Sequence, residues 1–125
     1  MLSEHFSRAE MACKCCHGLP VNGISQALLD GLEKLRTAIG NKPINVSSGY
    51  RCPVRNTEVD GVPNSDHMKG KAADIWVKGM SAYELGLQCQ NIFDGVGIYE
   101  EDDFVHVDMR SDGTEVGKYL WFYFK

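Results

Sequence analysis

Two histidines and one aspartate have the residue types and the setting of metal ligands. His67 follows a polar stretch that contains Gly, Pro and Asn. Asp74 lies inside an apolar, strand-like segment (72–77), and His106 lies in a second such segment (103–109). Two imidazoles and one carboxylate, with the fourth position left to water, form one of the ligand sets of catalytic zinc sites. A carboxylate within an apolar strand is costly to bury unless a cation or several donors meet it, so Asp74 is the most informative of the three.

Strand-like segments and turns would position these side chains. Segment 44–48 alternates like a half-buried strand and runs into a turn that leaves Arg51 near its end. Segments 95–99 and 103–109 are separated by an acidic turn, which predicts a hairpin. Because apolar residues pack inward, alternation along the second hairpin strand predicts that His106 faces a cleft or solvent. The two faces are Phe104, His106 and Asp108 on one side and Val105, Val107 and Met109 on the other.

Capping residues and apolar periodicity indicate the helices. They predict helices at 8–12, after Ser25 to about 39, after Cys52-Pro53 and from 82 to about 91. Ser7 with Glu10 and Ser81 with Glu84 have the spacing of capping boxes. The aromatic segment 118–124 is expected to be a final strand or a packed tail.

Length and charge exclude several classes of protein. With 125 residues, the chain is expected to form one domain (1–125) that buries a core without disulfide or metal staples. Its formal net charge of −4, without a basic cluster, argues against a nucleic-acid partner. The N-terminus lacks the pattern of a signal peptide, and no apolar run is long enough to cross a bilayer. We therefore expect a monomer that is made in the cytosol and does not insert into a membrane.

Five cysteines are an odd number in such a chain, which favours free thiols over a disulfide framework. Cys13, Cys15, Cys16 and His17 could supply thiolate and imidazole ligands to a structural zinc. This run crowds its ligands on one short loop and lacks a second, distant pair. Partly buried thiols in a loop are therefore the favoured interpretation.

The spacing of the candidate ligands resembles that of a known family. Residues 65–74 follow the pattern S-x-H-x-x-G-x-A-x-D, with His67 and Asp74 at its third and last positions. This is the signature of the zinc D-Ala-D-Ala carboxypeptidases and L-alanyl-D-glutamate endopeptidases, which cut peptidoglycan stem peptides. The S-G-Y-R at 48–51 and the F-V-H-V-D at 104–108 are similar to further segments of that family, in the same order. The matched segments span about half of the chain.

The resemblance implies a small α+β domain of the hedgehog/D-Ala-D-Ala-peptidase type, with an antiparallel sheet and helices packed on one side. It also implies that zinc is held by His67, Asp74 and His106. Family members use the arginine of S-G-Y-R to bind a substrate carboxylate or carbonyl, and this role carries over to Arg51. A guanidinium suits it through its permanent charge and planar fork, although a structural ion pair is the alternative. The other candidates for substrate binding or for orienting a ligand are Ser65, Tyr50 and Asp108.

The general base is expected among the acidic residues near the last ligand. Endolysin-like and dipeptidase-like members of the family carry an acid three residues before that histidine, which here is Asp103. Carboxypeptidase-like members carry a histidine five residues before it, where this chain has Glu101. Strand alternation would place Asp103 opposite to His106 unless a bulge or the turn re-aims it, so Glu101, Asp102 and Asp108 remain candidates.

The implied activity is zinc-dependent hydrolysis of an amide bond in peptidoglycan stem peptides, of the D-Ala-D-Ala carboxypeptidase or L-Ala-D-Glu endopeptidase type. A phage endolysin released to the wall fits a chain without a leader, as does a bacterial protein exported by an unconventional route. One alternative is an inactive zinc-binding module that recognises cell-wall peptide. The other is a metal-free domain in which His67 and Asp74 form a buried charge-assisted pair.

Overall fold

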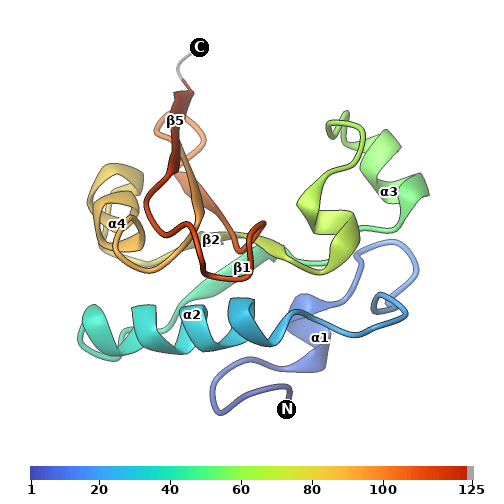
Figure 1. Cartoon of the computed structure of the whole chain (residues 1–125), viewed down its shortest axis with the longest axis horizontal. Coiled ribbons are helices and arrows are strands. Elements are labelled where there is room, and N and C mark those ends of the chain that lie inside the picture. The colour runs from blue at the N-terminus through green and yellow to red at the C-terminus, as the bar shows by residue number, and fades with distance from the viewer. Residues whose placement is uncertain (124–125) are drawn as a thin grey trace.

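A five-stranded sheet in the order β1-β2-β4-β3-β5 forms the centre of the computed structural model, which describes residues 1–123 (Figure 1). The strands are β1 (Asn45–Ser48), β2 (Ala72–Trp76), β3 (Gly95–Tyr99), β4 (Phe104–Asp108) and β5 (Tyr119–Tyr123). The pairs β1–β2, β2–β4 and β4–β3 are antiparallel, as expected. β5 instead pairs parallel with β3, so the sheet of this α+β domain is mixed. Phe124, the last residue of the predicted final strand, lies outside the described residues.

The parallel pairing of β5 follows from where the chain leaves β4. The end of β4 lies beside the start of β3, since Asp108 pairs with Gly95. The connection 109–118 stays at this end of the sheet, and Tyr119 also pairs with Gly95. β5 therefore begins at the end where β3 begins, and it runs in the same direction.

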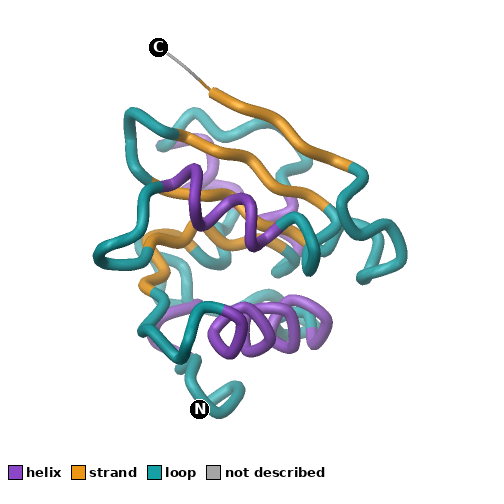
Figure 2. The backbone as a smooth tube through the Cα atoms, turned by 90° about the vertical axis from the view of Figure 1, so that its left-hand side faces the viewer, coloured by secondary structure: helices purple, strands orange, loops and turns teal. Residues whose placement is uncertain are grey.

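Most of the helical mass covers one face of the sheet. The helices are α1 (Arg8–Met11), α2 (Gln26–Ala38), α3 (Pro53–Glu58), α4 (Ala82–Cys89) and the 3-10 turn η1 (Asp66–Lys69). In Figure 2, α2 lies beneath the strands, and in Figure 1 α4 and α3 lie on opposite sides of them. The expectation of helices on one side thus holds for α2 and α4. α3 and η1 flank the other face.

Alternation along the strands separates an apolar face from a polar one. The buried residues toward α2 and α4 are Ala73, Ile75, Val96, Ile98, Val105 and Val107. On the opposite face, Asp74, His106, Gly97 and Trp121 pair in one row across β2, β4, β3 and β5. The predicted inward and outward sets of β4 are confirmed. One end of this row holds the candidate ligands, and the other end holds a tryptophan.

Local signals set the helix boundaries. Both capping boxes form, Ser7 with Glu10 and Ser81 with Glu84, and the Ser25 hydroxyl accepts from Leu28 N–H at the start of α2. α3 begins at Pro53, as predicted, with Cys52 as its N-cap. Among residues 1–123, no helix combines the length and the apolar character needed to span a bilayer.

Asp94 anchors the connection that delivers β5. Its carboxylate is fully buried and accepts from the backbone N–H groups of Ser111, Gly113 and Glu115, at 2.9, 2.9 and 3.0 Å. These three contacts hold the loop between β4 and β5 in place. The carboxylate thus gives the backbone N–H groups of this loop the acceptors that a neighbouring strand would otherwise provide.

We predict that Asp94→Ala lowers the free energy of unfolding by about 3 kcal/mol, because it leaves three backbone N–H groups of the loop without their acceptor. Chemical denaturation followed by circular dichroism measures the change. Asp30→Ala is the matched control, since Asp30 is exposed on α2 and accepts only a side-chain contact from Gln26. Equal stability of the two variants would contradict the anchoring role.

Candidate metal centre

The structure brings the three predicted ligands together from three elements. His67 projects from η1, Asp74 from the middle of β2 and His106 from β4. Oδ1 of Asp74 lies 3.2 Å from His67 Nε2 and 3.3 Å from His106 Nδ1. All three candidate donor atoms lie within 4.8 Å of one another. The side chains are largely buried, so these atoms converge at the floor of a cavity rather than on an open surface.

The donor separations fit a single zinc ion. Nitrogen and oxygen ligands lie about 2.0–2.2 Å from zinc, so two ligands of a tetrahedral ion are about 3.4 Å apart. The two separations that involve Asp74 are close to that length. Two imidazole nitrogens and a carboxylate oxygen are also donors that zinc accepts.

Outer hydrogen bonds select the nitrogen that each histidine presents. His67 Nδ1 lies 2.8 Å from the carbonyl oxygen of Gly49, which can only accept, so Nδ1 carries the proton. Nε2 of His67, 3.2 Å from Asp74 Oδ1, is then the nitrogen that remains available to a metal. His106 uses the reverse arrangement, with Nε2 donating to Asp108 Oδ2 at 2.7 Å and Nδ1 facing Asp74. Such partners fix the tautomer and the orientation of metal-binding imidazoles.

Asp108 is committed to orienting its neighbours. It is fully buried, and both of its oxygens also accept from Arg110, at 3.0 Å from Nε and 2.9 Å from Nη2. A Cβ at Gly95 would lie 2.3 Å from Asp108 Oδ2, so only glycine leaves room for the carboxylate there. The geometry thus favours the predicted orienting role of Asp108 over that of a base.

Arg51 lies on the other side of Asp74. Its Nη2 is 3.3 Å from Asp74 Oδ2, while Nε donates to Ser48 and Nη1 donates to Asn56. Asn56 is buried and is itself held by the carbonyl of Val62. Arg51 therefore makes a structural ion pair and also lines the cavity, so its position is compatible with both of its expected roles.

The ionisation states of Asp74 and His106 depend on each other and on their neighbours. Burial would raise the pKa of Asp74, but hydrogen bonds with His106 and His67 outweigh it and hold that pKa well below its usual range. Burial would lower the pKa of His106, but hydrogen bonds to Asp108 and Asp74 raise it to about 9. The metal-free site therefore prefers an ionised Asp74 and a protonated His106, which is a cation in the place where a metal would bind.

The cavity above these residues has a volume of about 730 Å³. Ser65 lines it, and the Ser65 hydroxyl also accepts from His67 N–H, as suits a residue that orients a ligand. Tyr50 is not among the residues that line the cavity, and its role in binding substrate or in orienting a ligand stays a prediction. An aromatic wall, which consists of Tyr99, Phe104, Trp121 and Tyr123, borders the cavity.

Arg110 and Trp121 line the cavity, but the sequence did not single them out as site residues. Arg110 lies 4.4 Å from the ring of Tyr119 and 5.5 Å from that of Trp121, and it shares the face of His106 and Asp108. Its position two residues beyond Asp108 was a usable signal, since alternation continues past the strand. No local signal places Trp121, because its neighbourhood depends on the pairing of β5 with β3.

The acidic turn between β3 and β4 presents one carboxylate to the cavity. Asp102 lines it, whereas Glu101 and Asp103 do not. Asp103 has a positive φ of 55°, a turn conformation that directs its side chain differently from the residues before and after it. The general base assigned to Asp103 stays a prediction, and the geometry favours the alternative Asp102.

Known proteins share this arrangement of motifs. The model of the peptidase M15 family matches residues 4–108, which include all three candidate ligands and Arg51. The chain belongs to the peptidase M15 family. This confirms the family to which the motifs pointed.

Relatives of this peptidase M15 chain are named as peptidoglycan L,D-endopeptidases and as a zinc D-Ala-D-Ala carboxypeptidase. The chain is 31% identical over 112 residues to peptidoglycan L,D-endopeptidase MepK of Shigella flexneri, covering 84% of this chain and 58% of that protein. It is 48% identical over 44 residues to zinc D-Ala-D-Ala carboxypeptidase of Streptomyces albus G, covering 35% and 17%. A probable MepK of Haemophilus influenzae is 31% identical over 96 residues, covering 70% and 52%. The chain thus spans little more than half the length of the MepK proteins.

We predict that zinc binds more tightly as pH rises toward about 9. His106 Nδ1 must lose a proton before it can bind a metal, and the raised pKa of about 9 means that this proton is present throughout the neutral range. The association constant should therefore increase roughly tenfold per pH unit below that pKa and level off above it. Competition with a chelator of known affinity at several pH values measures the slope. A constant affinity from pH 6 to pH 9 would contradict this coupling.

Proposed function

We propose that this peptidase M15 chain is a zinc-dependent peptidase that hydrolyses an amide bond in peptidoglycan stem peptides. The supporting observation is the convergence of His67 Nε2, Asp74 Oδ1 and His106 Nδ1 at the floor of a cavity with an arginine and an acid at its rim. The names of the relatives support the substrate class. Because this substrate forms the cell wall, the proposal places the action of the protein there.

The ligands leave one side of the metal position open to the cavity. Zinc held by His67, Asp74 and His106 supplies Lewis-acid polarisation of a carbonyl and a water of lowered pKa. Gly49 and Asp108 keep the two imidazoles in the correct tautomer. These protein groups therefore hold the ligand set ready before any substrate arrives.

Arg51 offers positive charge beside the reacting group. It is permanently charged, and contacts with Ser48 and Asn56 hold its guanidinium in place. A guanidinium at the cavity can anchor a substrate carboxylate or stabilise a developing oxyanion. A fixed position strengthens this role, since no side-chain freedom has to be lost at the moment of reaction.

Asp102 is the acid that we assign as the general base. It lies in the turn two residues before β4 begins and shares the cavity with His106. A carboxylate there can take a proton from the attacking water and transfer it to the leaving amine, so the proton lost by the nucleophile leaves with the product. Asp103, which does not line the cavity, would act only if the turn rearranged.

The aromatic wall binds the peptide beyond the reacting bond. Tyr99 stacks on Phe104, with 4.5 Å between ring centroids, and Trp121 Nε1 donates to the hydroxyl of Tyr99. These contacts make the wall rigid. Apolar walls with a few fixed polar groups are typical of sites for small organic ligands, and a cavity of about 730 Å³ lies within their usual size range.

Product analysis tests the proposed function. Purified peptidoglycan is incubated with the zinc-loaded protein, with and without a zinc chelator, and the released fragments are identified by mass spectrometry. We expect chelator-sensitive products, and either a new N-terminal D-Glu or the loss of a single D-Ala identifies the bond. His67→Ala should abolish the products. Full zinc occupancy without cleavage of several wall chemistries would instead favour a module that only binds cell-wall peptide.

Two neighbouring carboxylates test the general base. We predict that Asp102→Asn lowers kcat by roughly 100-fold or more while zinc content stays unchanged, since general bases contribute on this scale. Asp103→Asn is the matched control, because it removes a charge from the same turn but not from the cavity. It should retain a rate within a few-fold of the wild type. The reverse ranking would show that Asp103 is the base.

A further inference from the structure

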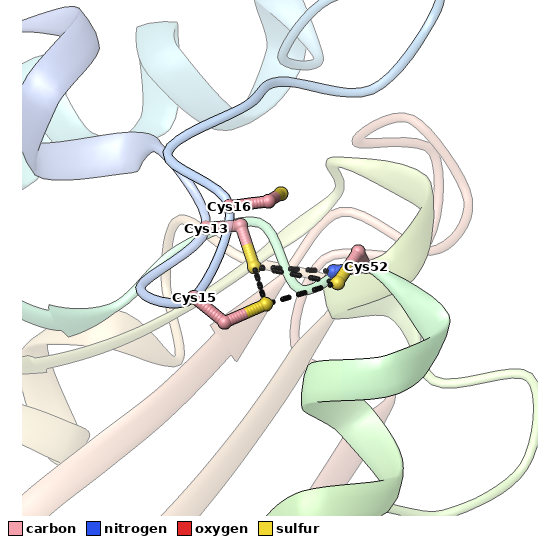
Figure 3. A group of neighbouring side chains, drawn as sticks. All are labelled: Cys13, Cys15, Cys16 and Cys52. Carbon is pink, nitrogen blue, oxygen red and sulfur yellow. Dashed lines mark hydrogen bonds between the residues drawn. The ribbon is translucent and has the colours of Figure 1, made fainter.

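Four of the five cysteines gather at a second place, away from the histidines. Figure 3 shows Cys13 and Cys15 on the N-terminal loop facing Cys52 at the start of α3, with Cys16 beside them on the same loop. The four sulfur atoms lie within 4.8 Å of one another. We propose that these four thiolates bind a second, structural zinc ion, which is distinct from the site in the cavity.

The sulfur separations match those of a tetrathiolate site. Zinc–sulfur bonds of about 2.3 Å place two sulfurs of a tetrahedral ion about 3.8 Å apart. The Sγ atoms of Cys13, Cys15 and Cys52 form a triangle with sides of 3.5, 3.7 and 3.3 Å. Slight expansion of this triangle makes one face of the tetrahedron. Cys16 is exposed, and its sulfur is turned away from the triangle, so rotation about χ1 is the change that completes the set.

Cys52 adds a ligand from a distant part of the chain, which the run 13–17 lacks by itself. The loop turns tightly, with His17 N–H donating to the Cys13 carbonyl and Cys13 N–H donating to the Gly18 carbonyl. His17 has a positive φ of 58° and is exposed, and it does not belong to the group of candidate ligands. In the proposed site, a cysteine 39 residues beyond Cys13 takes the place of the imidazole of His17.

Backbone donors around the sulfurs suit thiolates. Cys52 N–H donates to Cys13 Sγ at 3.5 Å, and Arg55 N–H donates to Cys52 Sγ at 3.4 Å. Such outer contacts orient metal ligands and stabilise their charge. The two sulfurs that accept these contacts belong to Cys13, which is buried, and Cys52, which is partly buried. Water stabilises a charge on these two sulfurs less than on the exposed ones.

A disulfide explains the group less well than a metal. The three sulfurs are nearly equidistant, so no pair is singled out, and any one bridge would leave two thiols behind. A metal uses all four. It also accounts for the odd total, because the fifth cysteine, Cys89, is the last residue of α4 and is buried in the core.

The proposed ion would tie the N-terminal loop to the segment that carries Arg51. Tyr50 N–H already donates to the carbonyl of Met11, and a Cβ at Gly49 would lie 2.6 Å from the same oxygen. Cys52 extends this contact to the next turn of the chain. The ion would therefore hold both neighbours of Arg51 against the loop, and through them the position of the guanidinium.

Metal stoichiometry and cobalt spectroscopy test the second site. We expect the zinc-loaded wild type to contain two zinc ions per chain by plasma mass spectrometry. Replacement by Co²⁺ should give a strong thiolate-to-cobalt charge-transfer absorption. His67→Ala should lose one metal and keep this absorption, whereas Cys52→Ser should lose one metal together with the absorption. Cys89→Ser is the matched control and should keep both metals.

The same measurements separate this site from the proposed enzyme. Absence of hydrolysis with an intact cobalt–thiolate absorption would contradict only the proposed function. If Cys52→Ser does not fold, the wild type still decides, since blocking four thiols of the native protein should release one zinc ion. The second site is refuted if the reduced wild type, offered excess zinc, holds only one ion that His67→Ala removes. It is also refuted if intact-mass analysis shows a disulfide under the same conditions.

Discussion

The carboxylate of Asp74 is the constraint on which the polar half of the structure depends. It lies in the middle of β2 with only 9% of its surface exposed, where an unpaired charge would be severely destabilising. One oxygen meets the two histidines and the other meets Arg51, so three elements outside β2 must approach the same residue. A metal ion would replace the proton on His106 as the positive charge there. The metal ion and the proton on His106 thus compete for the same position beside Asp74.

Glycines on β3 allow the sheet to carry both this site and an aromatic wall. A Cβ at Gly97 would lie 2.5 Å from the indole of Trp121, and one at Gly95 would overlap Asp108. Because both glycines lie on the polar face, the opposite face of β3 can still supply Val96 and Ile98 to the core. β3 therefore carries no side chains at Gly95 and Gly97, where Asp108 and Trp121 need the space, and carries apolar side chains on the face where the helices pack.

The sequence predicted what depends on local pattern and missed what depends on distant pairing. Strand alternation and capping residues placed Asp74, His106 and the helix starts correctly, because these signals act within a few residues. The parallel placement of β5 was not predicted, since it follows from a loop held by the buried Asp94. Cys52 was missed for the same reason. Its approach to Cys13 depends on how the N-terminal loop packs, which no spacing in the sequence encodes.

Family membership and substrate selection come from different parts of the fold. The peptidase M15 match ends at residue 108, so it includes the ligands, Arg51 and the cysteine loop. Trp121 and Tyr123, which form the far wall of the cavity, lie beyond it on β5. The row Asp74, His106, Gly97 and Trp121 joins the two parts directly, since neighbouring residues of one row are a single strand spacing apart. If the proposed function holds, a change in β5 would therefore alter which peptide is bound without disturbing the candidate ligands themselves.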